Sequence, residues 1–556
     1  MRIESEIRKY AIQNAVRYKG KANVGAVIGK LLAKNPKLKD NIQDISKKVK
    51  EIVEEVNSMP IEKQIKLFVE EEPKRKKEKK LPDLKNAKNV VMRFEPSPSG
   101  PLHIGHAYVL SLNSEYCRMY GGKFILRIGD TNPDNIYEPA YKLIEEDAKW
   151  LTKNNIKEVV VQSERLDIYY NYMEKLIKIG KAYICTCNQE EYKKMIMDKK
   201  PCPCRNLPKE EQLIRWKKMF KDYRKGEAVA RIKTDLNHKN PAMRDFPVFR
   251  INDSAHPRQG KKYRVWPLMN MAVTCDDIEM GITHIIRAKD HYDNAMRQKY
   301  IYEYLGKKFP EAIFVGRINF EGMPVSCSKI RPLVENKTYS GWDDIRLPFL
   351  AALRRRGYQP EALIKYALDV GISLSDKKVT NEEFFKTINA FNKEIIEPIS
   401  HRYFFVWEPK EILIENAPEQ EIELDLHPDN KKGGRRFKTK DVFYITKKDY
   451  LSLEENKLYR LMDCLNFVKK GEHLIFDSLD YRKYKENGKM IIHWLPKNNG
   501  LVKVEVLMPD NKKITGLGEK GLSSLKEGDI CQLERFGFCR LDKKEKGKLI
   551  FWYAHR

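Results

Sequence analysis

The chain has 556 residues, which is too many for a single hydrophobic core, so about three to five domains are expected. It carries 106 Lys and Arg residues against 78 Asp and Glu residues, and this net charge of +28 favours a polyanionic partner such as nucleic acid, although a lysine-rich proteome would give the same bias. Ten cysteines are too few for a disulfide scaffold and no apolar run is long enough to cross a bilayer, so a disulfide-rich secreted protein and a membrane protein are excluded and a cytoplasmic enzyme is expected.

Residues 1–80 are predicted to form a helical appendage that ends in a basic linker. Apolar residues recur there at helical spacing, as at Ile45, Val49 and Val53, and the segment from Asn57 to Pro60 breaks the pattern. The linker runs from Pro73 to Lys80. Its basic residues indicate either a solvated connection or a tail that contacts phosphates.

The pattern changes at Val90 to a short strand, a loop rich in proline and serine, a helix over about 102–119 and a second strand over 124–128. This order is a βαβ unit, the start of a doubly wound nucleotide-binding fold. We therefore assign residues 88–182 to the first half of a Rossmann domain. Strand and helix signals return at 276–306, and residues 261–335 are expected to complete the domain after an insertion at 183–260.

The rest of the chain divides into a helical and a strand-rich part. Residues 336–402 are predicted to be helical and include Arg354, Arg355 and Arg356. Residues 403–556 contain short strand-like segments separated by turn residues, at 442–445, 490–494, 502–507 and 549–553. One or two β-barrels are expected there, which makes the fold class a multidomain α/β protein.

A possible phosphate site precedes the first helix of the Rossmann unit. Prolines and Gly100 prevent an earlier start, so the helix begins near His103 and its free amides form an anion site. His103 and His106 then share one face of the first turn, and Gly105 leaves the backbone open to a ligand. Such an arrangement suits ATP activation, although a histidine pair alone is also typical of a surface or a metal site. The predicted ATP-binding residues are Pro98, Ser99, Gly100, Pro101, Leu102, His103, Ile104, Gly105 and His106.

Four cysteines within the insertion suggest a metal. Cys185 and Cys187 form one Cys-x-Cys pair, and Cys202 and Cys204 form another, fourteen residues further on. Four thiolates can hold one tetrahedral Zn²⁺ and leave no open position, so the predicted role is structural. The alternative is four reduced cysteines that pack as small apolar residues.

The string from Pro96 to His106 resembles the signature of class I aminoacyl-tRNA synthetases, and its Pro-Ser-Pro-Ser-Gly-Pro-Leu approach is similar to the glutamyl subgroup, especially the archaeal type. Further segments follow in the family's order: Gln162 to Arg165, Gly281 to Arg287, Gly341 to Asp344 and Asn466 to Lys469. The resemblance covers about 88–556. It implies a monomeric ATP-dependent ligase that uses Mg²⁺ to form glutamyl-adenylate from L-glutamate and charges tRNA(Glu), with tRNA(Gln) also allowed.

The same resemblance implies the roles of the domains and of a second catalytic loop. The insertion becomes a zinc-binding element at the tRNA acceptor end, the helical part contacts the tRNA stem, and the barrels bind the anticodon. The segment from Val325 to Ile330 is similar to the family's KMSKS loop, in which Lys329 neutralises the leaving pyrophosphate. Ser328 and Lys329 therefore join the predicted ATP-binding residues. His103, His106 and Lys329 are the predicted catalytic residues. The family's first lysine is absent here.

For the amino acid, the resemblance points to Arg93, Ser97, Asp130 and Arg287. Arg93 has the bidentate fork that suits a side-chain carboxylate, or it neutralises Glu95 at the strand end. Two family groups are missing, because Gly129 replaces the acid that holds the substrate ammonium and Met269 replaces a tyrosine. Asp130 could substitute for the acid. Two alternatives follow: a glutaminyl-tRNA synthetase, or a weakened paralogue that binds RNA without charging it.

A basic turn from His427 to Lys438 lies in the predicted barrel region. Such a surface can pair with phosphates and stack with unpaired bases, although a solvated loop has the same composition. The segment resembles the anticodon-binding barrels of glutaminyl and archaeal glutamyl synthetases. Arg435 and Arg436 are the predicted tRNA contacts.

Overall fold

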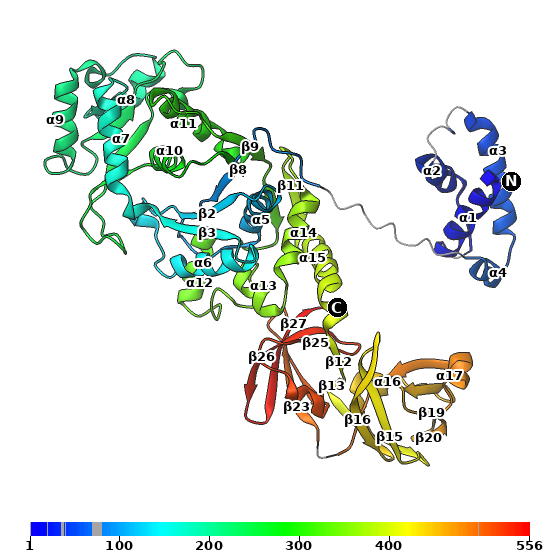
Figure 1. The fold of residues 1–556 in the computed structure, drawn as a ribbon. Coiled ribbons are helices and arrows are strands. Elements are labelled where there is room, and N and C mark those ends of the chain that lie inside the picture. Colours follow the sequence, from blue (N-terminus) through cyan, green and yellow to red (C-terminus); the bar gives the residue numbers. More distant parts are fainter. Residues whose placement is uncertain (1, 19, 35–37, 39–40, 69–79, 499) are drawn as a thin grey trace. The chain divides into compact units, whose positions relative to one another are not determined.

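The computed structural model describes residues 2–18, 20–34, 38, 41–68, 80–498 and 500–556. The chain divides into two compact units, residues 1–78 and 79–556, which are described separately (Figure 1). The predicted basic linker from Pro73 to Lys80 lies outside the described residues except for Lys80.

In the described part of the smaller unit there are four α-helices, α1 (Arg2–Arg17), α2 (Val24–Lys34), α3 (Ile42–Asn57) and α4 (Ile61–Lys66). The apolar face of α3 is buried against α1 and α2, as its helical spacing predicts, and α3 ends where the predicted break begins. The Asn57 amide then exchanges hydrogen bonds with the backbone of Ala22, which ties the end of α3 to the start of α2. This unit has a hydrophobic core of its own.

The catalytic part of the larger unit is built on a parallel sheet. Strands β1 (Val91–Phe94), β2 (Lys123–Ile128) and β3 (Ile156–Val161) pair in the order β1-β2-β3, and β8 (His284–Ala288) pairs with β9 (Glu311–Val315). Thr283 joins the two groups, because its N–H donates to the carbonyl of Val91 at 3.0 Å and its Oγ1 accepts from the N–H of Val91 at 2.9 Å. The strands therefore follow the order 3-2-1-8-9, a doubly wound arrangement that reverses direction beside β1.

Helices cover this sheet and carry the residues of the site. They are α5 (Ile104–Met119), α6 (Ala140–Leu151), α7 (Leu166–Lys178), α10 (Met269–Glu279) and α11 (Tyr292–Tyr304). Buried side chains of β1, β2, α5 and α6 form the main core together with α14 (Pro360–Val370) and α15 (Asn381–Ile396). A site at the carboxyl ends of β1, β2 and β8 is thus held by helices that come later in the chain.

The insertion forms an antiparallel sheet in the order β4 (Ala182–Cys185), β5 (Val229–Ile232), β6 (Pro247–Ile251) and β7 (Val265–Pro267), with α8 (Gln189–Met197) and α9 (Lys209–Met219). Our boundary at 260 cuts this sheet, because β7 pairs with β6 and shares its core. The insertion's sheet therefore ends at Pro267. A three-residue strand after a glycine turn carries too short a pattern to be assigned from sequence.

A mostly helical stretch connects the catalytic sheet to the C-terminal part. It contains β10 (Ile318–Glu321), α12 (Cys327–Glu335), α13 (Leu350–Arg356), α14, β11 (Lys377–Thr380) and α15. Strands β10 and β11 pair in parallel, although they are far apart in the sequence. Helix α14 packs against α5, the helix that begins at the predicted phosphate site.

The C-terminal part contains two barrel-like sheets of seven strands, each with its own core. One sheet combines β12 (His401–Tyr403), β13 (Phe405–Trp407), β23 (Val502–Leu507), β24 (Lys513–Gly518), β25 (Ile530–Leu533), β26 (Gly537–Glu545) and β27 (Lys548–His555). The other combines β14 (Pro409–Glu415), β17 (Val442–Thr446), β18 (Leu458–Leu461), β19 (Asn466–Lys470), β20 (His473–Ser478), β21 (Gly488–Ile492) and β22 (Leu495–Pro496), with α16 (Lys447–Leu451) and α17 (Tyr481–Asn487) beside it. Strands β15 (Gln420–His427) and β16 (Asn430–Thr439) form a hairpin that is a two-stranded sheet of its own. Together these sheets confirm the expected β-barrel region.

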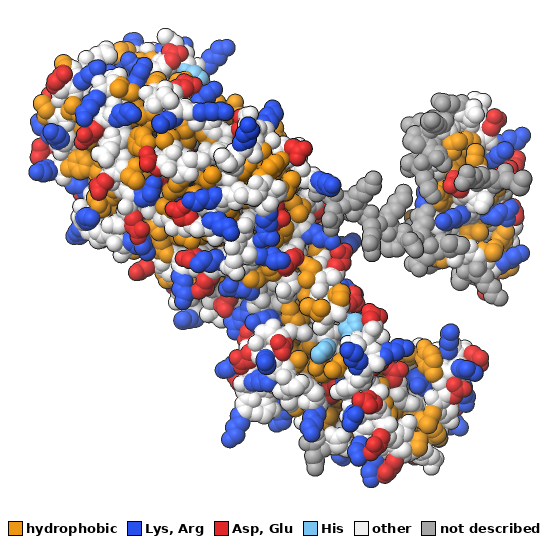
Figure 2. Space-filling model, viewed as in Figure 1, with side chains coloured by type: hydrophobic (Ala, Val, Ile, Leu, Met, Phe, Trp, Pro, Cys, Tyr) orange, Lys and Arg blue, Asp and Glu red, His pale blue; other side chains and the backbone are white. Residues whose placement is uncertain are grey.

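Lys and Arg side chains are scattered over the face of the molecule in Figure 2, with Asp and Glu side chains between them. The excess positive charge is therefore spread over this face and does not form one patch. None of the helices in the described ranges is long and apolar enough to cross a membrane.

Candidate functional site

The predicted phosphate site begins at the N-cap of α5. His103 is the N-cap residue, and its Nδ1 accepts from the N–H of Gly105 at 3.0 Å. The Nδ1 atom of His106 lies 3.3 Å from the N–H of His103, which completes a reciprocal cap. The two imidazole rings are tilted by 30° to one another with their centroids 3.9 Å apart, so the two histidines lie side by side at the start of α5.

The hydrogen bonds also fix the protonation of the two rings. Burial lowers the pKa of His103 well below its ordinary value and lowers the pKa of His106 to about 4, so both rings are neutral at pH 7. Because each Nδ1 accepts from a backbone N–H, the proton of each neutral ring is on Nε2. The pair therefore offers two Nε2–H donors, next to the N-terminus of α5, to an anionic ligand.

The loop that carries His103 is held by a segment far along the chain. The N–H of Ile104 donates to the carbonyl of Pro348 at 3.1 Å, and the N–H of Leu350 donates to the carbonyl of Leu102 at 3.0 Å. These bonds lie on either side of the bridge between His103 and Phe349. The N–H of Leu102 also lies 3.3 Å from Oδ2 of Asp147, a buried carboxylate on α6.

The predicted lysine loop lies against the phosphate loop. Cys327 starts α12, and a β-carbon added at Gly100 would lie 2.7 Å from its Sγ, so only glycine fits between the two loops. Phe320, on the strand before the lysine loop, is also near the phosphate loop, because a β-carbon added at Gly105 would lie 3.8 Å from its ring, an ordinary contact distance. Lys329 and Ser328 are exposed in the first turn of α12, and no hydrogen bond or ion pair is found for the side chain of Lys329 among the described residues. The structure thus brings the lysine loop and the histidine pair to one edge of the sheet.

The predicted amino-acid residues surround the ends of β1, β2 and β8. Arg93 is buried and donates from Nε and Nη2 to the two carboxylate oxygens of Asp277, at 3.1 and 3.2 Å. Its distance to Glu95 is longer, 3.6 Å, so the main partner of Arg93 is Asp277 and not Glu95. Burial raises the pKa of Asp277, but the charges of Arg127 and Arg93 outweigh it and hold this pKa below its usual value.

Arg287 differs from Arg93 in having no carboxylate partner among the described residues. Its Nη1 donates to the amide oxygen of Gln298 at 3.0 Å, and its Nε is buried without a hydrogen bond. Burial and then the charge of Arg93 lower the pKa of Arg287 to about 10. An unpaired buried guanidinium costs free energy that an anionic ligand would recover.

Two other predicted pocket residues are placed differently. Ser97 is exposed in the loop after β1. Asp130 is fully buried, where it accepts from the Tyr141 hydroxyl at 2.6 Å and from the Ser163 N–H at 2.8 Å, and His256 lies 3.4 Å away. These contacts occupy both carboxylate oxygens of Asp130. Asp130 therefore does not bind the substrate ammonium in place of the acid missing at Gly129.

Glu95 is the carboxylate that sequence reasoning missed. Its Oε2 accepts from Nε of Arg127 at 3.0 Å, whereas no hydrogen bond is found for its Oε1 within the described part of the chain. A β-carbon added at Gly129 would lie 3.6 Å from that free Oε1. The carboxylate therefore reaches, from the end of β1, the space beside Gly129 at the end of β2. The signal in the sequence was the pairing of an acid at 95 with a glycine at 129 on adjacent strands.

The four cysteines of the insertion converge. Their Sγ atoms all lie within 4.8 Å of one another, with 3.9 Å between Cys185 and Cys202 and 3.7 Å between Cys187 and Cys204. Four Zn–S bonds of ~2.3 Å at tetrahedral angles require sulfur separations of about 3.8 Å, so the donor set fits Zn²⁺. Arg215 donates to Sγ of Cys204 at 3.3 Å, as expected for a group that stabilises a thiolate.

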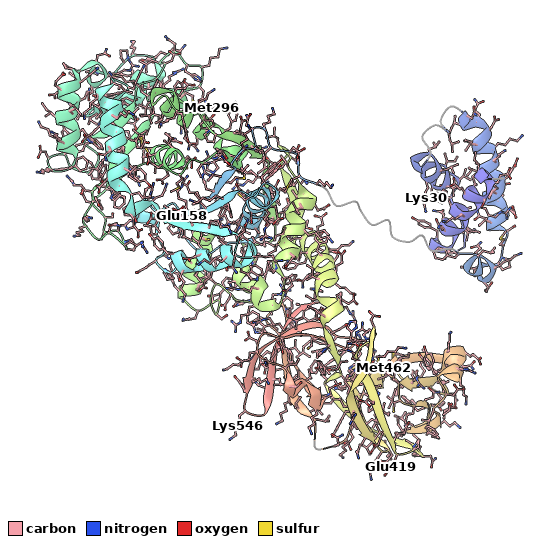
Figure 3. All side chains as sticks on the ribbon, in the orientation of Figure 1. Lys30, Glu158, Met296, Glu419, Met462 and Lys546 are labelled. Carbon is pink, nitrogen blue, oxygen red and sulfur yellow. The ribbon has the colours of Figure 1, made fainter. Side chains whose placement is uncertain are left out.

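The two arginines predicted to contact tRNA, Arg435 and Arg436, differ in how far they are buried. Arg435 is buried, donates to both oxygens of Glu519 and lies over the Phe404 ring at 4.4 Å, so it ties β16 to the residue that follows β24 and is not available to an external base. Arg436 is exposed and lies 3.2 Å from Glu423. Similar pairs continue along the hairpin to Glu419, labelled in Figure 3, which partly neutralise the basic run.

The fold and the site together define a nucleotide-binding α/β domain joined to barrel-like sheets, and family sequence models assign both parts. The catalytic domain of tRNA synthetases class I (E and Q) matches residues 89–398, and the anti-codon binding domain of the same group matches residues 400–474 and 491–542. The chain belongs to the class I tRNA synthetases of the E and Q group, which confirms the expected catalytic and anticodon-binding domains.

Curated relatives that align over the whole chain are named for one amino acid, glutamate. A glutamate–tRNA ligase of Methanocaldococcus jannaschii is 43% identical over 565 residues, and one of Pyrococcus furiosus is 44% identical over 584 residues; each alignment covers 100% of both chains. Among solved structures, a glutamate tRNA ligase of Elizabethkingia meningosepticum is 21% identical, with a TM-score of 0.40 over 56% of this chain and 70% of that one.

Proposed function

We propose that this chain is a glutamate–tRNA ligase, which activates L-glutamate with ATP to glutamyl-adenylate and transfers it to the 3′ end of tRNA(Glu). The observation that carries the choice of amino acid is Arg287, a buried guanidinium without a carboxylate partner among the described residues. A substrate carboxylate would satisfy its free donor, and a neutral amide would leave the charge unpaired. The full-length similarity to glutamate–tRNA ligases supports the same choice.

At the other end of the substrate, Glu95 is proposed to bind the ammonium group. Its Oε1 has no hydrogen bond among the described residues and lies beside the open space at Gly129. Arg127 holds Oε2 of the same carboxylate, which orients Oε1. The two ends of glutamate thus meet charges of opposite sign, Arg287 for the side chain and Glu95 for the ammonium.

The activation step needs donors where negative charge develops on the α-phosphate. The Nε2–H groups of His103 and His106 and the free amides of α5 supply such donors in fixed positions, which is the most effective form of electrostatic stabilisation. Lys329, exposed on the facing loop, is proposed to neutralise the departing pyrophosphate. Mg²⁺, when bound with ATP, would share the phosphate charge.

Finer parts of the proposal concern zinc, RNA and location. The four cysteines are proposed to hold a structural zinc ion in an insertion at the tRNA acceptor end, supported by their sulfur spacing. Arg436 is proposed to contact the anticodon from the exposed hairpin. The reduced cysteines of this cluster are in keeping with a cytoplasmic enzyme.

The test is pyrophosphate exchange with glutamate and with glutamine, each with and without tRNA. We expect exchange with glutamate in the presence of tRNA. Exchange with glutamine as the productive substrate would make the chain a glutaminyl-tRNA synthetase, and salt-sensitive tRNA binding without exchange would indicate a non-catalytic paralogue.

A substitution of Arg287 tests whether the choice of glutamate depends on this pocket residue. Arg287→Gln is expected to raise the KM for glutamate by about 10-fold or more, since a hydrogen bond to a charged group contributes roughly 1.5 to 3 kcal/mol. Arg264→Gln, which breaks an ion pair of the insertion, serves as the matched control and should leave this KM unchanged. Equal effects of the two variants would contradict the role of Arg287.

A further inference from the structure

The carboxyl ends of three adjacent strands meet around Gly129. Glu95, Gly129 and Gln162 directly follow β1, β2 and β3 of the parallel sheet. Because β2 lies between β1 and β3, Glu95 and Gln162 approach Gly129 from its two sides. A β-carbon added at Gly129 would lie 3.4 Å from Oε1 of Gln162 and 3.6 Å from Oε1 of Glu95. Two oxygen atoms therefore border the space that the absent side chain leaves.

The side chain of Gln162 is held in this orientation from behind. Its Nε2 donates to Oδ2 of Asp276 at 2.9 Å, and Asp276 is fully buried. The same carboxylate accepts from Nε of Arg165 at 2.7 Å, so it acts as an acceptor and the amide nitrogen of Gln162 must face it. The amide oxygen then faces Gly129. No hydrogen bond to that oxygen is found among the described residues, although Gln162 is only 2% exposed.

The two oxygens beside Gly129 are open to a ligand. Gly129 is half-buried, and in the described part of the chain neither Oε1 atom belongs to the polar atoms that are both enclosed and without a partner. A polar group on a buried side chain needs water or a ligand when the chain gives it no partner. A cation with several N–H donors fits two such acceptors, one of which is charged.

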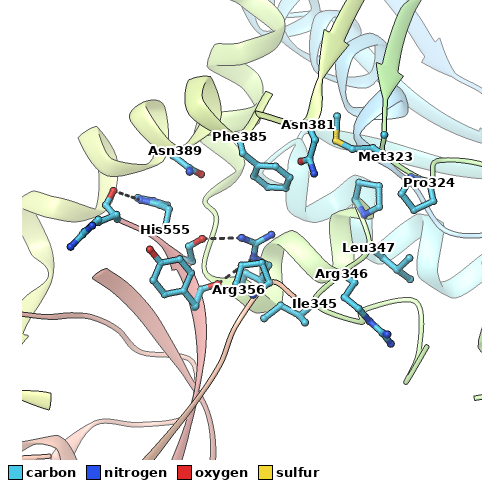
Figure 4. Close-up of a pocket in the computed structure, with 16 residues that line it drawn as sticks. Met323, Pro324, Ile345, Arg346, Leu347, Arg356, Asn381, Phe385, Asn389 and His555 are labelled. Carbon is cyan, nitrogen blue, oxygen red and sulfur yellow. Dashed lines mark hydrogen bonds between the residues drawn. The ribbon is translucent and has the colours of Figure 1, made fainter. Parts of the chain in front are cut away.

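The cavity of about 370 Å³ in Figure 4 shows the contrast, because cationic side chains that line it already have partners. Arg356 donates to the backbone carbonyl of Ala554 at 2.9 Å, and Nδ1 of His555 lies 3.2 Å from the carbonyl of Arg556. Size alone does not define a site for a polar ligand. The smaller space at Gly129 has the free acceptors that such a ligand needs.

An amide at position 162 supplies an acceptor without a second negative charge. An ammonium group has three N–H donors, and Glu95 offers only Oε1 because Arg127 holds Oε2. A carboxylate at position 162 would face the carboxylate of Asp276 at hydrogen-bond distance, and like charges so close are unfavourable. The amide avoids this repulsion and still provides a second oxygen.

We propose that Gln162 is a specificity-determining residue, whose amide oxygen binds the α-ammonium group of the substrate together with Glu95. The pair selects an amino acid over a dicarboxylate of the same length that has no amino group. The inference rests on the proposed function for the identity of the ligand as glutamate. It adds the residue that completes the ammonium site where the chain has Gly129.

The test compares glutamate with glutarate, which has the same carbon chain and both carboxylates but no ammonium group. The KM for glutamate and the Ki of glutarate are measured in pyrophosphate exchange with ATP and tRNA. Gln162→Met keeps the length of the side chain and removes the acceptor. We expect it to raise the KM for glutamate by about 10-fold, as for a lost hydrogen bond to a charged group, and to change the Ki of glutarate by less than about 2-fold.

Tyr169→Phe is the matched control for the other bond that Gln162→Met loses. The Tyr169 hydroxyl donates to Oδ2 of Asp276 at 2.7 Å, the same oxygen that accepts from Gln162. Its loss disturbs Asp276 without removing an oxygen at Gly129. The ratio of the KM for glutamate to the Ki of glutarate should therefore stay within about 2-fold of that in the unmodified chain.

A second variant keeps the inference testable if Gln162→Met folds poorly. Gln162→Lys places a cation beside Gly129, and this cation can still pair with Asp276. It should weaken glutamate by more than about 10-fold and leave glutarate bound at least as tightly as before, because only glutamate brings a like charge to this point.

Other outcomes would count against Gln162 or against the proposed function. Equal changes of the two constants in Gln162→Met and in Gln162→Lys, or a change of their ratio in Tyr169→Phe as large as in Gln162→Met, would overturn the role of Gln162 and leave the proposed function intact. An unmodified chain without exchange on glutamate would contradict the proposed function. Calorimetric binding of glutamate and glutarate to the same variants would then still decide the role of Gln162.

Discussion

Residues of the same type in this site differ in the partners that they already have. Arg93 and Arg127 share Asp277 and Glu95, whereas Arg287 has only an amide oxygen and so keeps a charge for a ligand. The predicted list of pocket residues contained both Arg93 and Arg287, because residue type and position in a motif say nothing about partners. The main partner of Arg93, Asp277, lies on α10, 184 residues further along the chain, and the partner of Arg287, Gln298, lies on α11.

The proposed role of Glu95 in binding the substrate ammonium can be tested by removing its charge. Glu95→Gln keeps the shape of the side chain but removes the charge opposite the substrate ammonium. We expect the KM for glutamate to rise by about 10-fold, while the KM for ATP changes by less than about 2-fold, because the lost interaction is a charge-assisted hydrogen bond to the amino acid alone. Steady-state pyrophosphate exchange measures both constants.

A relocation variant provides the control for that prediction. Gly129 has no positive φ, and a β-carbon there meets its neighbours at ordinary distances of 3.4 Å or more. Glu95→Ala combined with Gly129→Glu should therefore recover part of the glutamate affinity that Glu95→Ala alone loses. Identical constants for Glu95→Gln and the unmodified chain would show that another group binds the ammonium.

At the scale of single elements, local rules predicted much of the structure. Prolines and Gly100 ahead of His103 placed the start of α5 correctly, and apolar spacing placed α3 and β23. The errors arose where tertiary contacts decide. Arg435 is buried against Glu519, which follows β24 much later in the chain, and β7 belongs to the insertion because β6 pairs with it.

The cysteine cluster gives a prediction for the insertion. Cys202→Ser replaces one thiolate by a poor zinc ligand, and we expect metal analysis to find one zinc per unmodified chain and none in the variant. Charging of tRNA should fall more than ~10-fold, whereas exchange with glutamate falls less, because the insertion is proposed to contact the tRNA acceptor end and not the adenylate. Both reactions are measured on the same preparation.

Cys464→Ser is the matched control, because Cys464 is buried in a barrel core away from the cluster. It should keep its zinc. An unmodified chain purified without zinc, or a Cys202→Ser chain that keeps it, would show that the four cysteines serve only as packed side chains.

At the scale of the whole molecule, the two compact units have separate hydrophobic cores. Within the described residues, the core of the smaller unit lies between Ile7 and Phe68, and the catalytic and barrel cores begin at Leu81. The histidine pair, the lysine loop, the amino-acid pocket and α13 all belong to the larger unit. Composition predicted that the chain would have several cores but could not say which of them the chemistry needs.

Separate cores predict that the units fold and act independently. A chain without residues 2–78 should keep exchange with glutamate and tRNA within about 2-fold of the full chain, because every residue proposed to act in exchange belongs to the larger unit. Residues 1–78 alone should show a helical circular dichroism spectrum and one cooperative thermal transition, since four helices around one core of this size can fold alone. An inactive shortened chain with a normal melting transition would instead mean that the helical appendage takes part in the reaction, and an unfolded 1–78 segment would mean that its helices depend on the rest of the chain.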